Sequence, residues 1–319
     1  MAILNNYHTL VELAKRTKPD GNMAELINTL AEKNPMLEEA HWEQANDINS
    51  HQFVQVISEP MGSFGRINKD IPFSAARTKQ VVEPIGSIVD ALKVDERLLE
   101  KAPNASEYMA REAELHVSGM GKTAHRTLLY GSRAVEPDGI DGFMTRLSAL
   151  GSNVINGGAT GAATSSILVV KWGRDGAYLT YPRNFGKFLE EKGPDRVWVS
   201  EGQGASGGYW AQVATWAINM GLCIAKPKNV QRIANISAAG GQNGFNADLL
   251  VQALDSLDNT DGAVIYVPKA VYTQMNIALM NKTNTHYSRE EEWGRPVLHF
   301  MGIPVKRCDQ MLATETALV

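Results

Sequence analysis

Residues 105–130 read ASEYMAREAELHVSGMGKTAHRTLLY, and this stretch predicts a single helix of unusual length. Asn104 stands directly before it as a good N-cap residue, and Glu107 completes the spacing of a capping box. Gly131 stands directly after it, where glycine commonly ends a helix. At about 1.5 Å per residue the helix would be roughly 39 Å long, which exceeds most helices of globular proteins. We therefore expect the fold to be organised around this helix.

The segment before this helix has the composition of β-structure. Residues 53–57 and 80–89 are rich in β-branched side chains, and the stretch between them contains two prolines and two glycines. We expect residues 51–92 to form a long two-stranded hairpin with a basic, loosely structured tip. An isolated hairpin is barely stable in water, so its length indicates that a partner subunit covers it.

The rest of the chain mixes strands and helices, which predicts a mixed α+β fold. Residues 1–50 are interpreted as an extended leader that carries two short helices. We expect strands at 167–172, 177–181, 209–217, 221–225, 230–236, 264–267, 297–301 and 305–308, and helices at 248–257 and 268–280. The first two of these strands are interpreted as a hairpin across residues 173–176.

Composition excludes several classes of protein. The chain of 319 residues has a formal net charge of −4, which gives no basic excess for binding nucleic acid by bulk electrostatics. Its two cysteines do not form a disulfide framework, and neither a signal peptide nor a membrane span is recognisable. We therefore expect a protein made in the cytoplasm.

The glycine-rich stretch at 202–208 raises the one enzymatic alternative. It contains the pattern G-x-S-x-G around Ser206, which is the nucleophile elbow of serine hydrolases. Triad partners in the right chain order would be Asp248 or Asp255, followed by His286 or His299. The elbow requires a strand–turn–helix, but the residues after Ser206 favour a strand, so a serine hydrolase stays a minor alternative.

Other candidate sites lack support in the sequence. The spacing G-x-G-x-x-G at 202–207 lacks both the helix and the acidic residue that a dinucleotide site requires. The histidines and cysteines show no metal-binding motif, and the carboxylates form no local acid–base pair. We therefore predict no enzyme, no cofactor and no metal.

The order of these elements is similar to one known family. A leader, a long hairpin, one long helix and a mixed α/β module resemble the HK97-type capsid subunit, and within it the gp7-like family of phage major capsid proteins. The stretches that carry this resemblance are LAKR at 13–16, NPMLEE at 34–39, LLYG at 128–131, GIDGF at 139–143, VVKWG at 169–173 and VQRIANI at 230–236. Their order and spacing extend over some 230 residues.

The resemblance implies a division of the chain into the parts of a capsid subunit. These are an N-arm at 1–50, an extended hairpin called the E-loop at 51–92, a peripheral domain at 93–132 and 209–236 with a spine helix at 105–130, and an axial domain at 133–208 and 237–319. The pieces of the axial domain would follow the long returning strands, in a permuted order.

The resemblance also implies a function. The chain would self-assemble into pentamers and hexamers of an icosahedral phage head that encloses double-stranded DNA without sequence-specific contact. It would be assembled in the host cytoplasm, with a separate scaffolding protein, a portal and a decoration protein as partners, and without cleavage of this chain. The same fold also builds encapsulins, bacterial shells that hold protein cargo, and this alternative stays open.

Candidate contacts between subunits follow from the basic charges of the hairpin, with a solvated surface as the alternative. Acidic partners of the basic hairpin would be Asp95, Glu96 and Glu100, or the run at 290–292. The candidate contact residues are Phe64, Arg66, Lys69, Arg77, Lys79, Glu290, Glu291 and Glu292.

Overall fold

The computed structural model describes residues 35–68, 70–71, 73–184, 189–200, 207–280, 287–292 and 295–318, with only the backbone at 279–280, 287–292 and 295–297. The chain divides into two compact units. The described part of unit 1 lies within residues 87–126 and 187–219, and unit 2 comprises residues 33–86, 127–186 and 220–319. Both units mix helices and strands, which confirms the predicted α+β class.

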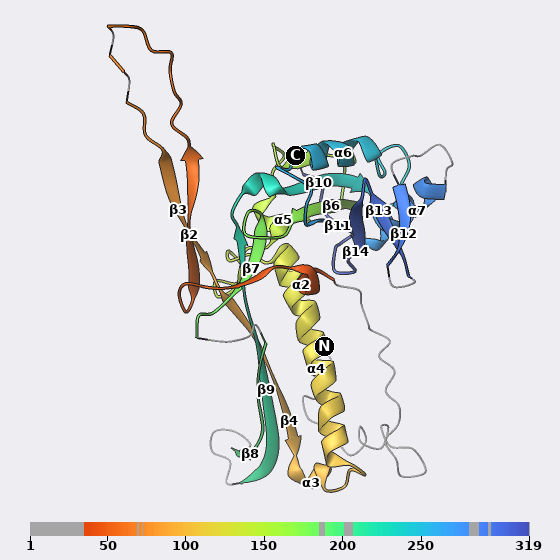
Figure 1. Ribbon diagram of the computed structural model, residues 1–319. Helices are drawn as coiled ribbons and strands as arrows, with labels where there is room; N and C mark the ends of the chain where they lie inside the picture. Colours follow the sequence, from red (N-terminus) through yellow and green to blue (C-terminus); the bar gives the residue numbers. More distant parts are fainter. Residues whose placement is uncertain are drawn as a thin grey trace. The chain divides into compact units, whose positions relative to one another are not determined.

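A seven-stranded sheet forms the centre of unit 2 (Figure 1). Its strands, in spatial order, are β12 (Tyr287–Glu292), β13 (Arg295–Phe300), β14 (Ile303–Arg307), β11 (Ala263–Val267), β6 (Thr164–Lys171), β10 (Val230–Ser237) and β5 (Val154–Asn156). β6 is an interior strand and pairs antiparallel with both β10 and β11. The predicted strands in this part of the chain are confirmed.

The core of unit 2 lies on one face of this sheet. All eight residues of β6 are buried, which is the pattern of a strand covered on both faces. Ile167 and Val169 point into a hydrophobic cluster shared with helices α6 (Ala247–Asp255) and α7 (Lys269–Met280). Figure 1 shows α6 beside β10, and contacts join these two elements.

The opposite face of the sheet is closed by the C-terminal segment. The Glu315 carboxylate accepts hydrogen bonds from Ser166 and Tyr130 and pairs with Arg232 at 2.9 Å. The Arg232 and Glu315 side chains are only 6% and 7% exposed. Burial, together with the charge of Glu315, raises the pKa of the Tyr130 phenol. A buried ion pair and its hydrogen bonds therefore attach the end of the chain to the sheet.

The pairing of the strand at residues 177–181 differs from the prediction. β7 (Ala177–Tyr181) pairs parallel with β1 (Trp42–Gln44) and antiparallel with the last residues of β9 (Gly208–Ile224). The expected hairpin between the strands at 167–172 and 177–181 is therefore wrong. Both edges of β6 are already occupied by β10 and β11, so β7 has no edge of β6 to pair with.

Unit 1 contains most of the long helix, α4 (Ala105–Tyr130), whose predicted bounds are confirmed. The Glu107 amide donates to Asn104 Oδ1 at 3.2 Å, as the N-cap prediction requires. The first part of β9 pairs antiparallel with β8 (Leu189–Ser200), and β4 (Gly86–Asp95) is its other neighbour. The two strands predicted at 209–217 and 221–225 are thus one continuous strand.

Short elements complete the described structure. They are α2 (Met36–Glu39), α3 (Glu96–Leu99), α5 (Phe143–Arg146), a 3-10 turn at Pro227–Asn229, and the hairpin strands β2 (Ser50–Ser58) and β3 (Arg77–Pro84). No described helix is both long enough and apolar enough to cross a membrane. The described residues also contain no cluster of histidine, cysteine or carboxylate side chains that could hold a metal ion.

Candidate assembly interface

The strands β2 and β3 form a separate two-stranded antiparallel sheet, as predicted. Their register runs from Ser50 opposite Pro84 to Ser58 opposite Arg77, and residues 59–76 connect them. Within the described chain no third strand pairs with them, and the residues after Pro84 enter β4 in another sheet. A pair of strands without further partners is marginal in water, so its stability depends on what lies against its faces.

One face of the hairpin packs on unit 2 near its base. Alternate residues of a strand share a face, and His51, Phe53 and Gln55 all point the same way. The Tyr178 hydroxyl lies 3.1 Å from His51 Nε2, and the Tyr178 ring lies 6.4 Å from that of Phe53. The Gln55 amide donates to the backbone carbonyl of Ile224 at 3.0 Å. This face is therefore covered by the hairpin's own subunit.

An ion pair anchors the end of β3. Arg146 binds both carboxylate oxygens of Glu83, at 2.7 and 2.6 Å, and also donates to the carbonyl oxygens of Asp141 and Leu222. Burial alone would lower the pKa of the Arg146 guanidinium, but the hydrogen bonds and charge of Glu83 outweigh it and raise this pKa. The base of the hairpin is thus fixed to unit 2 by a charge-assisted, bidentate contact.

Electrostatics at the base favour a neutral histidine. Burial lowers the pKa of His51, and the nearby charge of Glu43 only partly opposes this effect. Burial also raises the pKa of the Tyr178 phenol. Both groups are therefore held in their neutral forms, which suits the hydrogen bond between them.

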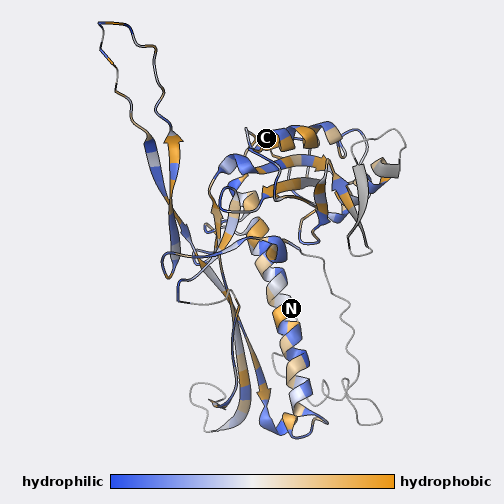
Figure 2. Ribbon diagram, viewed as in Figure 1, coloured by the Kyte–Doolittle hydropathy of each residue, from blue (hydrophilic) through white to orange (hydrophobic). Residues whose placement is uncertain are grey.

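The opposite face of the hairpin is exposed. Val54, Val56 and Val82 lie on it because Gln52 is opposite Val82 and Val54 and Val56 follow at alternate positions. Their exposed fractions are 64%, 60% and 54%. Figure 2 shows hydrophobic residues along this hairpin as well as in the seven-stranded sheet. The hairpin therefore presents an apolar face that its own subunit leaves uncovered.

The tip of the hairpin is the most exposed apolar part of the described chain. Its large hydrophobic residues, all at least 79% exposed, are Met61, Phe64, Ile67, Ile71 and Phe73. Monomeric proteins rarely expose apolar residues in such a group, and larger patches mark sites of protein contact. The valine face and this tip together form the candidate assembly interface.

The predicted basic contact residues lie on or near this surface. Arg66 lies in the tip two positions after Phe64, and Arg77 and Lys79 lie on β3, all of them exposed. Within the described part of the chain these three side chains form no ion pair. Lys69 lies outside the described residues.

The predicted acidic residues are placed less uniformly. Asp95 pairs with Arg97 at 2.7 Å, and Glu96 pairs with Arg196 at 2.8 Å, so both are engaged within their own subunit. Glu100 is exposed and forms no ion pair with the residues described. The run Glu290, Glu291 and Glu292 lies in β12, opposite Val297, Pro296 and Arg295, and its side chains lie outside the description.

Sequence analysis missed two parts of this surface. It named Phe64 but not Phe73, Ile67 or Ile71, although an apolar residue between turn-forming residues is itself a signal of exposure. It also missed the valine face. Alternation along β2 places Val54 and Val56 on one face, but the sequence does not say which face of the hairpin the subunit covers.

The structure does not support the nucleophile elbow. Ser206 lies outside the described residues, as does His286. The chain that follows is strand β9, which begins at Gly208, whereas the elbow requires a helix at this place. His299 lies in β13, and Asp248 and Asp255 lie in α6.

Comparison with protein families decides the identity. The family model described as Major capsid protein GP7 matches residues 18–319. The chain belongs to this family of phage major capsid proteins. The resemblance seen in the sequence is therefore confirmed, and the chain is a major capsid protein.

A solved structure shares the fold of this capsid protein. A chain in the structure of bacteriophage Epsilon15 is 23% identical, covers 100% of this chain and 99% of its own length, and has a TM-score of 0.79. The capsid of phage XM1 and the SrpI encapsulin of Synechococcus elongatus have TM-scores of 0.46 and 0.48, at 8% and 11% identity. These matches cover 66% and 72% of this chain and 95% and 97% of the matched chains. TM-scores below 0.5 do not establish a shared fold. A search of curated proteins found no match. The fold is the HK97 type.

Proposed function

We propose that this capsid protein self-assembles, through its hairpin, into pentamers and hexamers of an icosahedral phage head that encloses double-stranded DNA. The observation that carries the proposal is the uncovered hairpin, whose valine face and tip expose large apolar side chains. Such a surface costs solubility in a lone subunit, and a neighbouring subunit can cover it in a shell.

The parts of a capsid subunit are assigned accordingly. We assign residues 1–50 to the N-arm, 51–92 to the E-loop, and 93–132 with 209–236 to the peripheral domain around the spine helix. The axial domain then takes residues 133–208 and 237–319, in a permuted order. Because β10 lies between β6 and β5 in the seven-stranded sheet, we propose to move residues 230–236 from the peripheral domain to the axial domain.

The remaining partners follow from the same assignment. A separate scaffolding protein, a portal and a decoration protein are proposed to act with this chain, and assembly is proposed in the host cytoplasm. The formal net charge of −4 suits a wall that encloses DNA without gripping it. We also infer that the chain catalyses no reaction.

Electron microscopy of the purified protein tests the proposal. The chain is expressed alone and with its neighbouring genes, and the particles are imaged and treated with nuclease. We expect closed shells tens of nanometres across in which DNA packaged by the full gene set resists digestion. A uniformly small oligomer under every condition would contradict the proposal.

The same preparation separates the two alternatives. An encapsulin-like shell would give small particles that hold protein cargo and no DNA. A serine hydrolase would cleave model esters and lose this activity in Ser206→Ala, whereas the capsid proposal expects no ester hydrolysis from either chain.

A further inference from the structure

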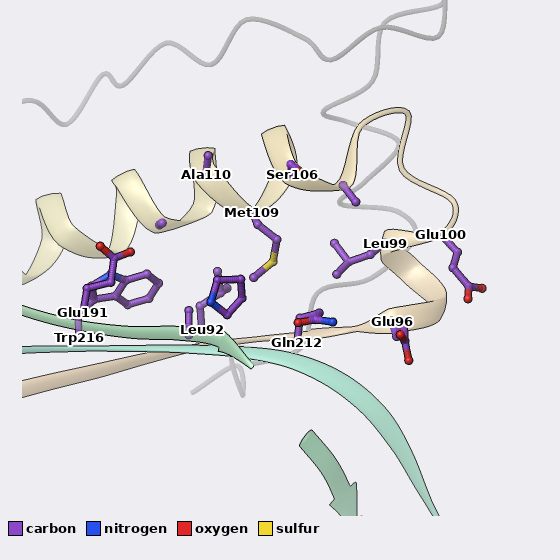
Figure 3. Close-up of a pocket in the computed structure, with 14 residues that line it drawn as sticks. Leu92, Glu96, Leu99, Glu100, Ser106, Met109, Ala110, Glu191, Gln212 and Trp216 are labelled. Carbon is purple, nitrogen blue, oxygen red and sulfur yellow. The ribbon is translucent and has the colours of Figure 1, made fainter. Parts of the chain in front are cut away.

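A groove in unit 1 is lined mainly by apolar side chains. It lies between the N-terminal half of α4 and the strands β4, β8 and β9, and has a volume of about 550 Å³. Figure 3 shows Met109 pointing from the helix toward the strands, with Leu92, Leu99 and Trp216 also lining the space. This volume lies within the roughly 300–1,000 Å³ of sites that hold compact ligands, so the groove has room for a large side chain.

The charges around this groove have one sign. The ionisable side chains that line it are Glu96, Glu100 and Glu191. Glu96 is neutralised by Arg196, but Glu100 and Glu191 form no ion pair within the described structure, and Figure 3 places them at opposite ends of the groove. The groove therefore suits an apolar side chain that has a positively charged side chain near it.

The hairpin tip has this chemistry. Phe64 is fully exposed, and Arg66 follows two positions later. Between residues 59 and 79 the chain has four basic and two acidic residues, a net charge of +2 (4 − 2). The tip thus offers an aromatic ring beside a positive charge, and the groove offers an apolar space beside unpaired carboxylates.

We propose that Phe64 of one copy of this chain inserts into the groove of a second copy, where Arg66 pairs with Glu100. The inference rests on the proposed function, because it names the surface that receives the hairpin. The two surfaces are different patches of the same chain, so the contact is heterologous. A heterologous contact repeated around an axis closes into a ring, as pentamers and hexamers require.

Disulfide trapping tests this contact directly. The native cysteines, Cys223 and Cys308, are both buried and form no disulfide within the described structure, so they give little background. Phe64→Cys combined with Met109→Cys is assembled and oxidised, and we expect a ladder of linked subunits on a non-reducing gel that collapses with reductant. In the matched control, Phe64→Cys combined with Val135→Cys, the second thiol is exposed but outside the groove, and no ladder is expected.

The outcomes separate this inference from the proposed function. Shells that form normally in the Phe64→Cys, Met109→Cys variant but give no ladder, or the same ladder as the control, overturn the inference and leave the capsid function standing. If the wild-type chain forms no shells with its full gene set, the proposed function itself fails.

Assembly thresholds give a second, independent test. Because burying a phenylalanine ring is worth roughly tenfold to a hundredfold in an equilibrium constant, Phe64→Ala is expected to raise the concentration needed for assembly by at least about tenfold. Arg66→Glu is expected to raise it as well, and Glu100→Arg in the same chain to restore it. Glu114, exposed on α4 and outside the groove, supplies the control. If Glu114→Arg restores assembly as well as Glu100→Arg does, only net charge matters and the inference is wrong.

Discussion

The strand β6 and the hairpin strand β2 have similar β-branched composition and opposite burial. All residues of β6 are buried, because its own chain supplies α6 and α7 on one face and the C-terminal segment on the other. In β2, Val54 and Val56 are more than half exposed. The sheet is therefore complete within one subunit, whereas we propose that another copy covers the exposed face of the hairpin. Changes in β6 should affect folding, whereas changes on the exposed face and at the tip of the hairpin should affect assembly.

The largest effect on folding is expected for Glu315→Ala. This change leaves Arg232 buried without its carboxylate, and the loss of one partner of a buried ion pair costs about 3–5 kcal/mol. Urea unfolding of the unassembled subunit measures the change. Glu136→Ala, which removes an exposed acid, is the control and should change the free energy of unfolding by less than about 0.5 kcal/mol. Equal effects of the two changes would show that the sheet does not depend on this closure.

A smaller effect is expected for Glu83→Ala at the base of the hairpin. Arg146 would lose its two hydrogen bonds to the carboxylate but keep those to two backbone carbonyl groups. Hydrogen bonds to charged groups are worth roughly 1.5–3 kcal/mol, so we expect a loss of about 2 kcal/mol. Glu59→Ala, in the exposed connection, should leave the unfolding free energy unchanged. We also expect Glu83→Ala to increase hydrogen exchange in β2 and β3 but not in β6. This result would show that the ion pair stabilises the hairpin and not the seven-stranded sheet.

A third change tests the long helix. Asn104→Ala removes the side-chain oxygen that accepts the Glu107 amide, and loss of an N-cap typically costs about 1 kcal/mol. Asn104→Asp keeps this acceptor and should keep most of the stability. Thermal unfolding of both variants measures the difference, and equal melting temperatures would contradict the capping role.

The smallest effect is the pH dependence of the hairpin base. The pKa of His51 lies below its ordinary value of 6.5, so the unfolded chain takes up a proton more readily than the folded one. The stability contributed by neutral His51 is therefore fully present above pH 6.5 and is lost as the pH falls through the lowered pKa. His51→Phe should flatten the decrease in stability between pH 7 and pH 5, measured by urea unfolding. If the free energy of unfolding of this variant falls with pH as steeply as that of the wild type, other groups cause the decrease.

Local signals in the sequence predicted the local structure well. Asn104 and Gly131 fixed both ends of α4, because capping depends on neighbouring residues only. Pairing between distant strands was harder to predict: β6 and β7 are adjacent in sequence but lie in different sheets, since the partners of β6 come from residues 230–237 and 263–267. Sequence signals could not reveal Glu315 as the closing residue, because its three partners are 83 to 185 positions away.

The sequence also identified part of the exposed surface that forms the candidate interface. Composition identified the basic tip and Phe64, because exposure of a turn region is a local property. The acidic partners were harder to choose, since Asp95 and Glu96 are engaged by Arg97 and Arg196 within the folded subunit. The groove itself forms only when α4 packs on β4, β8 and β9, so no single stretch of sequence encodes it.

One variant tests the central claim, that the tip of the hairpin serves assembly and not folding. Residues 59–76 are replaced by an Asn-Gly turn, which joins the remaining strands in a short hairpin. The unassembled subunit is unfolded in urea, and its assembly is followed by electron microscopy. We expect the free energy of unfolding to stay within about 0.5 kcal/mol of the wild-type value and closed shells to be absent. Normal shells from this variant, or a subunit that no longer folds, would contradict the account.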